Sequence, residues 1–204
     1  MKLYQYIYSD SSRRVRIFLA EKGIEIPFES VDITRGESHT PGFTAKNPMG
    51  QVPVLELDDG AYLAESIAIC RYIEEIHPQP PLFGRTAREH AEIEMWSRRV
   101  ELGLTQPVKR LFQLRYVPAG SLSTATLDDV AAMERRETQA AFRFLDETLA
   151  QREYIAGSTY SIADIMALCT YDMAVSQMRI PLDVDLSSLS RWHDAVSIRP
   201  SART

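Results

Sequence analysis

The sequence predicts a small α/β domain followed by an all-helical domain. Three observations predict it. Strand-like and helical patterns alternate over the first 78 residues, a proline-rich stretch follows, and every later pattern is helical. We therefore expect an α/β domain over 1–78, a linker over 79–85 and a helical domain over 86–204. A chain of 204 residues is long enough for two small domains.

The first elements have the order strand, helix, strand. Leu3 to Tyr8 is rich in aromatic and aliphatic residues, which is typical of a strand. Val15, Phe18 and Leu19 then repeat at the helical spacing i, i+3, i+4, and Gly23 is a suitable helix stop. The segment "IPFESVDI" predicts a second strand reaching position 33. The three elements form a βαβ unit, whose two strands are parallel.

A hairpin and a helix complete the predicted α/β domain. Val52 to Leu57 and Ala61 to Leu63 flank "DDG", which favours a tight antiparallel hairpin. A helix begins near Ser66 and must end before Pro78. The segment "HPQPPLFG" is the predicted boundary, because clustered prolines continue neither helix nor sheet. The resulting order is βαβ followed by ββα.

Helical spacing dominates the rest of the chain. The sequence "SIAD" at Ser161 to Asp164 has the form of a capping box at a helix start. Pro107 is expected to kink or end the first helix after the linker. The apolar residues that repeat at helical spacing are Ile93, Trp96 and Val100, then Val130, Met133, Phe144 and Leu145, then Ile162, Ile165, Met166 and Cys169.

Composition excludes several classes of function. A net charge of -5 makes nucleic acid or an anionic membrane an unsuitable main partner, so Arg13, Arg14 and Arg16 need a local explanation. Cys70 and Cys169 are too far apart, and too far from other ligand types, to indicate a disulfide framework or a metal site. Two buried thiols in a reducing compartment, with no signal peptide or membrane span, predict a cytoplasmic protein.

A cluster of helix-capping residues separates the first strand from the first helix. Ser9, Asp10, Ser11 and Ser12 are all good N-cap residues, although a helix needs only one. Turn and capping chemistry alone is one interpretation of this cluster. The other interpretation is that one of these hydroxyls serves a function.

Four segments, in this order and spacing, resemble the glutathione transferase superfamily: "SDSSRRVRIFLAEKGI", "KNPMGQVPVLELDDGAYLAES", "GSTYSIADI" and "WHDAVSIRPS". The resemblance covers the whole chain and is strongest to the bacterial and fungal branch related to the theta and zeta classes. It implies a thioredoxin-like N-terminal domain, an all-α C-terminal domain and a cytosolic homodimer with a detoxifying role. It also implies that Asp164 supports the fold.

The resemblance also implies a glutathione site in the N-terminal domain. A proline inside a strand by itself indicates only an edge or a bulge, and "ES" by itself only a helix start. In thioredoxin-like folds the Val-Pro bond is cis, and the valine backbone pairs with the tripeptide. The helix N-terminus would hold the γ-glutamyl carboxylate. The implied glutathione contacts are His39, which is displaced by one from the histidine of relatives, Gln51, Val52, Pro53, Glu65 and Ser66.

Aligned by "RVRI", Ser9 matches the catalytic serine of the theta and zeta classes. A thiol of pKa about 8.5 needs roughly 2 kcal/mol of thiolate stabilisation to be half ionised near pH 7, and one hydroxyl donor supplies about that much. Ser11 and Ser12 are the other candidate catalytic residues, and Asp10, Ser11 or Ser12 would cap the helix. The candidate contacts to a second substrate are Trp96, Arg99, Phe112 and Tyr116.

The resemblance implies attack of glutathione thiolate on an electrophilic, hydrophobic substrate. Glutathione is then a substrate, and neither a metal nor a redox cofactor is expected. A second interpretation is glutathione-dependent reduction of a disulfide or a hydroperoxide. A third is a non-catalytic protein that binds glutathione or a hydrophobic ligand, because a fold does not determine a function.

Overall fold

A computed structural model describes residues 1–204 except 118–119, 122 and 183–184. The chain divides into two compact units, and each is described here by itself. The first unit comprises residues 1–82 together with 200–204, and the second comprises residues 83–199. The last five residues therefore pack in the first unit, although the pattern in the sequence had joined them to the helical part.

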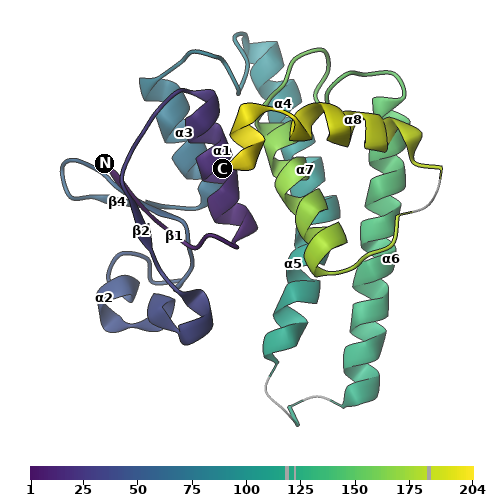
Figure 1. Ribbon diagram of the computed structural model, residues 1–204, viewed down its shortest axis with the longest axis horizontal. Coiled ribbons are helices and arrows are strands. Elements are labelled where there is room, and N and C mark those ends of the chain that lie inside the picture. The colour runs from purple at the N-terminus through teal and green to yellow at the C-terminus, as the bar shows by residue number, and fades with distance from the viewer. Residues whose placement is uncertain (118–119, 122, 183–184) are drawn as a thin grey trace. The chain divides into compact units, whose positions relative to one another are not determined.

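The first unit contains a four-stranded mixed sheet in the order β2-β1-β3-β4 (Figure 1). Its strands are β1 (Lys2–Gln5), β2 (Phe28–Ser30), β3 (Val54–Glu56) and β4 (Tyr62–Ala64). β1 is parallel to β2 and antiparallel to β3, and β3 and β4 form the antiparallel hairpin. The predicted thioredoxin-like order βαβ-ββα is confirmed.

Three helices accompany this sheet: α1 (Asp10–Glu21), α2 (Pro41–Thr44) and α3 (Ser66–Ile76). α1 ends where predicted, because Gly23 adopts a left-handed φ of 65° and its N–H donates to the carbonyl of Ala20 over 3.1 Å. The predicted second strand is too long. β2 ends at Ser30, and the chain continues as two short 3₁₀ turns before α2.

The alternation of side chains along the strands divides the core between the two faces of the sheet. Tyr4 lies opposite Val54 and packs with Phe43 of α2 on one face. Leu3 lies opposite Leu55, and both are fully buried on the other face. α1 and α3 pack against each other, and α3 contacts β3 and β4. The N-termini of α1 and α3 are therefore held by a packed core.

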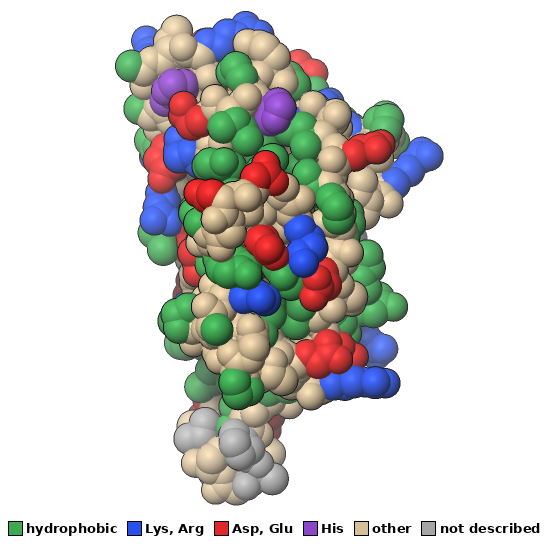
Figure 2. Space-filling view, turned by 90° about the vertical axis from the view of Figure 1, so that its left-hand side faces the viewer, with side chains coloured by type: hydrophobic (Ala, Val, Ile, Leu, Met, Phe, Trp, Pro, Cys, Tyr) green, Lys and Arg blue, Asp and Glu red, His purple; other side chains and the backbone are tan. Residues whose placement is uncertain are grey.

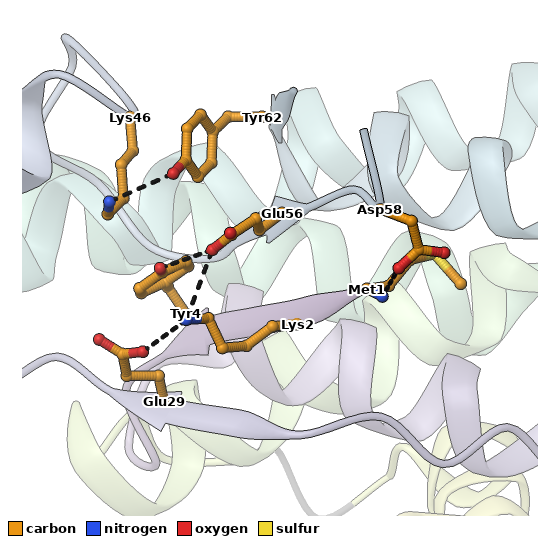
Figure 3. A network of polar contacts seen from close by, with 8 residues as sticks. All are labelled: Met1, Lys2, Tyr4, Glu29, Lys46, Glu56, Asp58 and Tyr62. Atoms are coloured by element: carbon orange, nitrogen blue, oxygen red, sulfur yellow. Dashed lines mark hydrogen bonds and ion pairs between the residues drawn. The ribbon is translucent and has the colours of Figure 1, made fainter. Parts of the chain in front are cut away.

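A network of charged and aromatic side chains ties the strands together near the face that contacts α2 (Figure 3). The Tyr4 hydroxyl donates to Glu56 over 2.7 Å, and Lys2 pairs with Glu56 and with Glu29 of β2. The bond from Tyr4 lowers the pKa of Glu56, because it stabilises the carboxylate form. Lys46 reaches the hydroxyl of Tyr62 on β4. Lys46 Nζ also lies 5.2 Å from the centroid of the Tyr4 ring, which connects β4 to the other three strands on this side.

The second unit is helical, as predicted. Its elements are α4 (Ala87–Val100), η3 (Glu101–Thr105), α5 (Gln106–Gln113), η4 (Leu114–Tyr116), α6 (Thr124–Leu149), α7 (Ile162–Asp172), η5 (Met173–Gln177) and α8 (Ser187–Ser197). Near Pro107, α4 passes through the π-helical turn η3 into α5. Pro107 is the second residue of α5, just after this π-helical turn.

Asp164 organises the core of the second unit. It is fully buried at the start of α7 and accepts hydrogen bonds from the N–H groups of Ile155 and Ser161, over 2.9 and 3.0 Å. The indole N–H of Trp192 on α8 donates to it over 2.9 Å. Burial raises the pKa of Asp164 to about 6, although these hydrogen bonds oppose the shift. Its contacts support the structural role that the resemblance implied for it.

Several features of the surface and core bear on the functions considered. Cys70 and Cys169 are buried and form no disulfide. On the face drawn in Figure 2, acidic and basic side chains alternate with apolar ones. Within the described part of the chain, no helix has the length and apolar character needed to cross a membrane. The same residues contain no group of three or more His, Cys, Asp or Glu side chains placed to hold a metal ion.

Candidate active site

Ser9 lies in the turn between β1 and α1 and is the N-cap of α1. Its Oγ accepts a hydrogen bond from the N–H of Ser12 over 3.3 Å, and its side chain is partly exposed. A hydroxyl that accepts one bond still has a proton to donate. The Ser9 hydroxyl proton has no acceptor among the residues described. This donor lies at the positive end of the α1 dipole, which favours an anion nearby.

The other hydroxyls of the cluster have separate contacts. Ser12 is fully buried, and its Oγ accepts from the N–H of Tyr6 over 3.3 Å. The Ser11 hydroxyl donates to the carboxylate of Asp10 over 3.3 Å. The expectation that Asp10, Ser11 or Ser12 caps the helix is wrong, because α1 begins at Asp10 and Ser9 is its N-cap. The three hydroxyls therefore have separate roles: Ser9 caps α1, Ser12 fixes the turn at Tyr6, and Ser11 contacts Asp10.

The three arginines of α1 each have a local contact within the first unit. Arg16 donates to the side-chain carbonyl of Gln5 over 2.6 Å and to the backbone carbonyl of Ile7 over 3.0 Å, which fixes the turn before Ser9. Arg13 donates to the carbonyl of Ala202 over 3.0 Å. Arg14 donates to Ser66 Oγ over 2.8 Å. These contacts provide the local explanation that Arg13, Arg14 and Arg16 required.

Arg14 links the start of α1 to the start of α3. It is 5% exposed, and its Nη2 lies 3.7 Å from the carboxylate of Asp10. Its Nε and Nη2 have no hydrogen-bond partner among the described residues. Sequence analysis singled out Arg14 as needing a local explanation but gave it no role in the site, although the Asp10–Arg14 spacing of i, i+4 was a usable signal. A buried cation with unused donors therefore lies beside Ser66.

The backbone at the start of α3 is in an unusual conformation. Glu65 is exposed and has a φ of 67° and a ψ of 114°, which is uncommon for a residue with a Cβ. Ser66 is the first residue of α3 and is buried, apart from 6% of its surface. The unpaired N–H groups at a helix N-terminus favour an anion. Arg14 adds a full positive charge at the same place.

The loop before β3 presents unpaired backbone groups. The Val52–Pro53 peptide bond is cis, as the resemblance implied. Neither the N–H nor the carbonyl of Val52 has a hydrogen-bond partner among the described residues, and Val52 is only half-buried. The Asn47 side chain holds the loop, donating to the carbonyl of Gln51 over 2.7 Å and accepting from Met49 over 3.1 Å. Asn47 is a residue that sequence analysis missed.

His39 lies against the same loop. Its side chain is exposed, and its Nδ1 would come within 2.5 Å of a Cβ placed on Gly50, which has a φ of 61°. A residue with a side chain at position 50 would therefore displace this ring. Ser38, by contrast, is almost fully buried, and Gln51 is exposed. The absence of a side chain at Gly50 thus allows His39 to lie next to the segment that carries Gln51 and Val52.

The candidate contacts to a second substrate form two separate pairs in the second unit. The Trp96 ring is 4% exposed and lies 4.5 Å from the guanidinium of Arg99. Phe112 and Tyr116 have ring centroids 5.2 Å apart, and Tyr116 is 59% exposed. Arg99 also lines a groove of about 590 Å³ between α4 and α6.

The comparisons with known proteins decide the family. A family model of the glutathione S-transferase N-terminal domain matches residues 3–81, and one of the C-terminal domain matches residues 110–200. Glutathione S-transferase 2 of Saccharomyces cerevisiae is 34% identical over 93% of this chain and 82% of its own length. The chain belongs to the glutathione S-transferase family.

Solved structures agree with this assignment. The crystal structure of Gtt2 from Saccharomyces cerevisiae has a TM-score of 0.89 and 32% identity, covering 100% of this chain and 99% of that one. Among the relatives compared by sequence, a maleylacetoacetate isomerase of Pseudomonas aeruginosa is 47% identical over 95 residues, which are 44% of this chain and 45% of that protein. This transferase therefore has relatives of the fungal and bacterial kinds that the sequence resembled, and glutathione is its substrate.

Proposed function

We propose that this transferase joins the glutathione thiolate to an electrophilic carbon of a hydrophobic substrate, with Ser9 stabilising the thiolate. The observation that carries the proposal is the Ser9 hydroxyl, which caps α1 and keeps its proton available. A hydroxyl bond to an anion contributes about 1.5–3 kcal/mol, and the α1 dipole adds some tenths. This sum is close to the roughly 2 kcal/mol that half-ionisation near pH 7 requires.

Two anchors hold the peptide part of glutathione in this proposal. The unpaired N–H and carbonyl of Val52 pair with the tripeptide backbone as an added strand, beside the ring of Pro53. The γ-glutamyl carboxylate lies at the N-terminus of α3, where Ser66 and the positive charge of Arg14 stabilise it. The exposed carboxylate of Glu65 would pair with the ammonium group of the γ-glutamyl residue of glutathione. Gln51 and His39 would contact the rest of the tripeptide.

The reaction balances simply for an aryl halide. The thiolate sulfur forms a bond to the ring carbon, and the halide leaves with the electron pair of its bond to carbon. Ser9 donates a hydrogen bond to the sulfur before attack and holds the sulfur in place. Residues of the second unit, among them Trp96, Arg99, Phe112 and Tyr116, would supply the contacts to the electrophile.

Activity assays separate this chemistry from the alternatives. The purified protein is tested with glutathione and an aryl halide, a small disulfide and an organic hydroperoxide, each with the Ser9→Ala variant alongside. Conjugation of the aryl halide with a large loss in Ser9→Ala supports the proposal. Faster turnover of the disulfide or the hydroperoxide would assign the protein to reduction instead. Glutathione binding without any turnover would make it a non-catalytic binding protein.

A homodimer is part of the same proposal. The groove between α4 and α6 has an apolar surface, on which Met95, Leu102 and Phe144 are 41%, 66% and 45% exposed. Arg98 and Glu137 lie among its lining residues. In a two-fold dimer, a patch on one subunit faces the same patch on the other subunit. A patch that carries both a positive and a negative side chain can therefore form ion pairs with its copy. We also propose that the protein lies in the cytoplasm, where its two cysteines, which form no disulfide, would stay reduced.

A further inference from the structure

The Lys46 side chain lies over two tyrosine rings of the sheet in the first unit (Figure 3). Its Nζ is 5.2 Å from the centroid of the Tyr4 ring on β1 and 4.9 Å from that of the Tyr62 ring on β4. The same ammonium donates to the Tyr62 hydroxyl over 3.3 Å. A cation within about 6 Å of an aromatic face is attracted by the negative charge of that face. Lys46 is therefore held to two strands at once.

The loop that the proposed function assigns to glutathione begins directly after Lys46. We call residues 47–53 the 47–53 loop. The Asn47 side chain accepts from the N–H of Met49 over 3.1 Å, and the N–H of Gly50 donates to the carbonyl of Asn47 over 2.9 Å. Both bonds lie within the loop, so they fix its shape but do not attach it to the sheet. Lys46 supplies an attachment to the sheet at the start of the loop.

The rings that hold Lys46 also belong to the packing around the valine of the loop. The apolar cluster consists of Tyr4, Val31, Phe43 and Val54, and the side chains of Val52 and Tyr62 pack against it. The 47–53 loop is thus attached to one cluster twice, at its start through Lys46 and near its end through Val52. A shift of Lys46 away from the rings would loosen the first attachment and leave only the second.

We infer that Lys46 is a positioning residue for glutathione, whose ammonium fixes the 47–53 loop so that the Val52 backbone can pair with the tripeptide. The inference rests on the proposed function, in which Val52 makes this contact. A loop that is in the binding position for only part of the time raises the apparent Kd in inverse proportion to that fraction. Once glutathione is bound the loop is in place, so the reaction of the bound thiolate is unaffected.

The test replaces Lys46 with methionine, which keeps most of the stem and removes the ammonium. Lys46→Arg retains a cation that can lie over the rings. Lys2→Met is the matched control, because Lys2 Nζ lies 4.7 Å from the centroid of the same Tyr4 ring. The ion pairs of Lys2 are with Glu29 and Glu56, which lie on strands. Steady-state kinetics at varied glutathione give KM and kcat for each protein.

We expect Lys46→Met to raise KM for glutathione at least about 5-fold and to change kcat at saturating glutathione by less than about 2-fold. Hydrogen exchange without glutathione tests the position of the loop by itself. The amides of Met49 and Gly50 should exchange at least about 5-fold faster in Lys46→Met, because the loop opens more often. Lys46→Arg and Lys2→Met should stay within about 2-fold of wild type in both measurements.

Four results would overturn the inference. The first is an unchanged KM in Lys46→Met, and the second is an equal rise in Lys2→Met. The third is a loss of kcat with an unchanged KM, which would assign Lys46 a role in stability alone. The fourth is a raised KM with unchanged exchange at Met49 and Gly50, which would mean that Lys46 contacts glutathione itself.

Asn47→Ala separates a failure of this inference from a failure of the proposed function, because Asn47 shapes the same loop through bonds of its own. If Asn47→Ala raises KM and Lys46→Met does not, the loop binds glutathione and only the role of Lys46 is overturned. If neither variant changes KM although the loop exchanges faster in both, the proposed contact of Val52 fails, and the inference fails with it.

Discussion

Replacing Arg14 with methionine tests the electrostatics of the γ-glutamyl anchor. Methionine keeps most of the buried stem and removes only the guanidinium. In the native protein that group donates to Ser66 Oγ over 2.8 Å and lies 3.7 Å from Asp10. Its Nε and Nη2 remain without partners among the described residues. The variant therefore removes a positive charge from beside Ser66 with little change in packing.

The expected loss falls on glutathione binding. A hydrogen bond or close contact between charged groups contributes about 1.5–3 kcal/mol, which corresponds to a roughly 10- to 150-fold rise in KM for glutathione. The turnover number at saturating glutathione should change much less, because the γ-glutamyl group is far from the reacting sulfur. Stability should fall little, since a buried cation with unpaired donors is costly to desolvate.

The measurement is steady-state kinetics at varied glutathione, combined with thermal unfolding with and without glutathione. Binding to the native state alone raises stability by RT ln(1 + [L]/Kd), so Arg14→Met should gain less from glutathione than the wild type does. Arg13→Met is the matched control. It removes the neighbouring guanidinium, which donates to the carbonyl of Ala202. This variant should leave KM for glutathione unchanged.

Two results would refute this reasoning. One is a KM for glutathione within about 2-fold of wild type in Arg14→Met, which would mean that the carboxylate does not depend on this charge. The other is an equal rise in KM in Arg13→Met, which would point to a general effect of charge. A variant that loses kcat with an unchanged KM would move Arg14 from the anchor to the reacting sulfur.

Three further experiments test other parts of the account. Ser66→Ala and Glu65→Gln should each raise KM for glutathione more than they lower kcat, and an unchanged KM in both would exclude this γ-glutamyl site. The raised pKa of Asp164 means that its contribution to unfolding free energy is present below pH 4 and is lost, by roughly 3 kcal/mol, as pH rises through 6. Denaturant unfolding of wild type and Asp164→Asn between pH 4 and 7 measures this slope, which should be absent in the variant. Leu102→Glu should yield monomers in sedimentation analysis and Ile198→Glu, which alters another exposed apolar residue, should not, so a dimer that persists in Leu102→Glu would remove the groove from the interface.

Much of the fold was predictable, because its signals are local in sequence. The helix stop at Gly23 and the capping acid Asp164 depend on residues a few positions away. The hairpin around "DDG" was equally clear, since its short loop of Asp58, Asp59 and Gly60 determines the register of the two strands. The strand ending at Ser30 was overestimated because Val31 is buried in the core without belonging to a strand. Burial and strand pairing produce the same sequence pattern there.

The candidate site was less predictable, because its contacts join distant segments. Ser9 and Ser66 were singled out through the resemblance, yet nothing in the sequence showed that Arg14 bonds to Ser66 across 52 positions. The contacts of two arginines in the second unit were hidden for the same reason. Arg115 and Arg135 reach carbonyls that lie 62 and 43 residues further along the chain. Contacts between residues so far apart in the sequence depend on how the helices pack, and no local sequence motif indicates them.

The central claim is that the Ser9 hydroxyl stabilises the thiolate of bound glutathione. Its most direct test is the pKa of the bound thiol, measured by ultraviolet absorbance of the thiolate across a pH titration in wild type and Ser9→Ala. A free thiol titrates near 8.5, and we expect the wild-type complex to titrate about 1–2 units lower, with Ser9→Ala returning most of that shift. A bound thiol that titrates at the same pH in both proteins would contradict the claim.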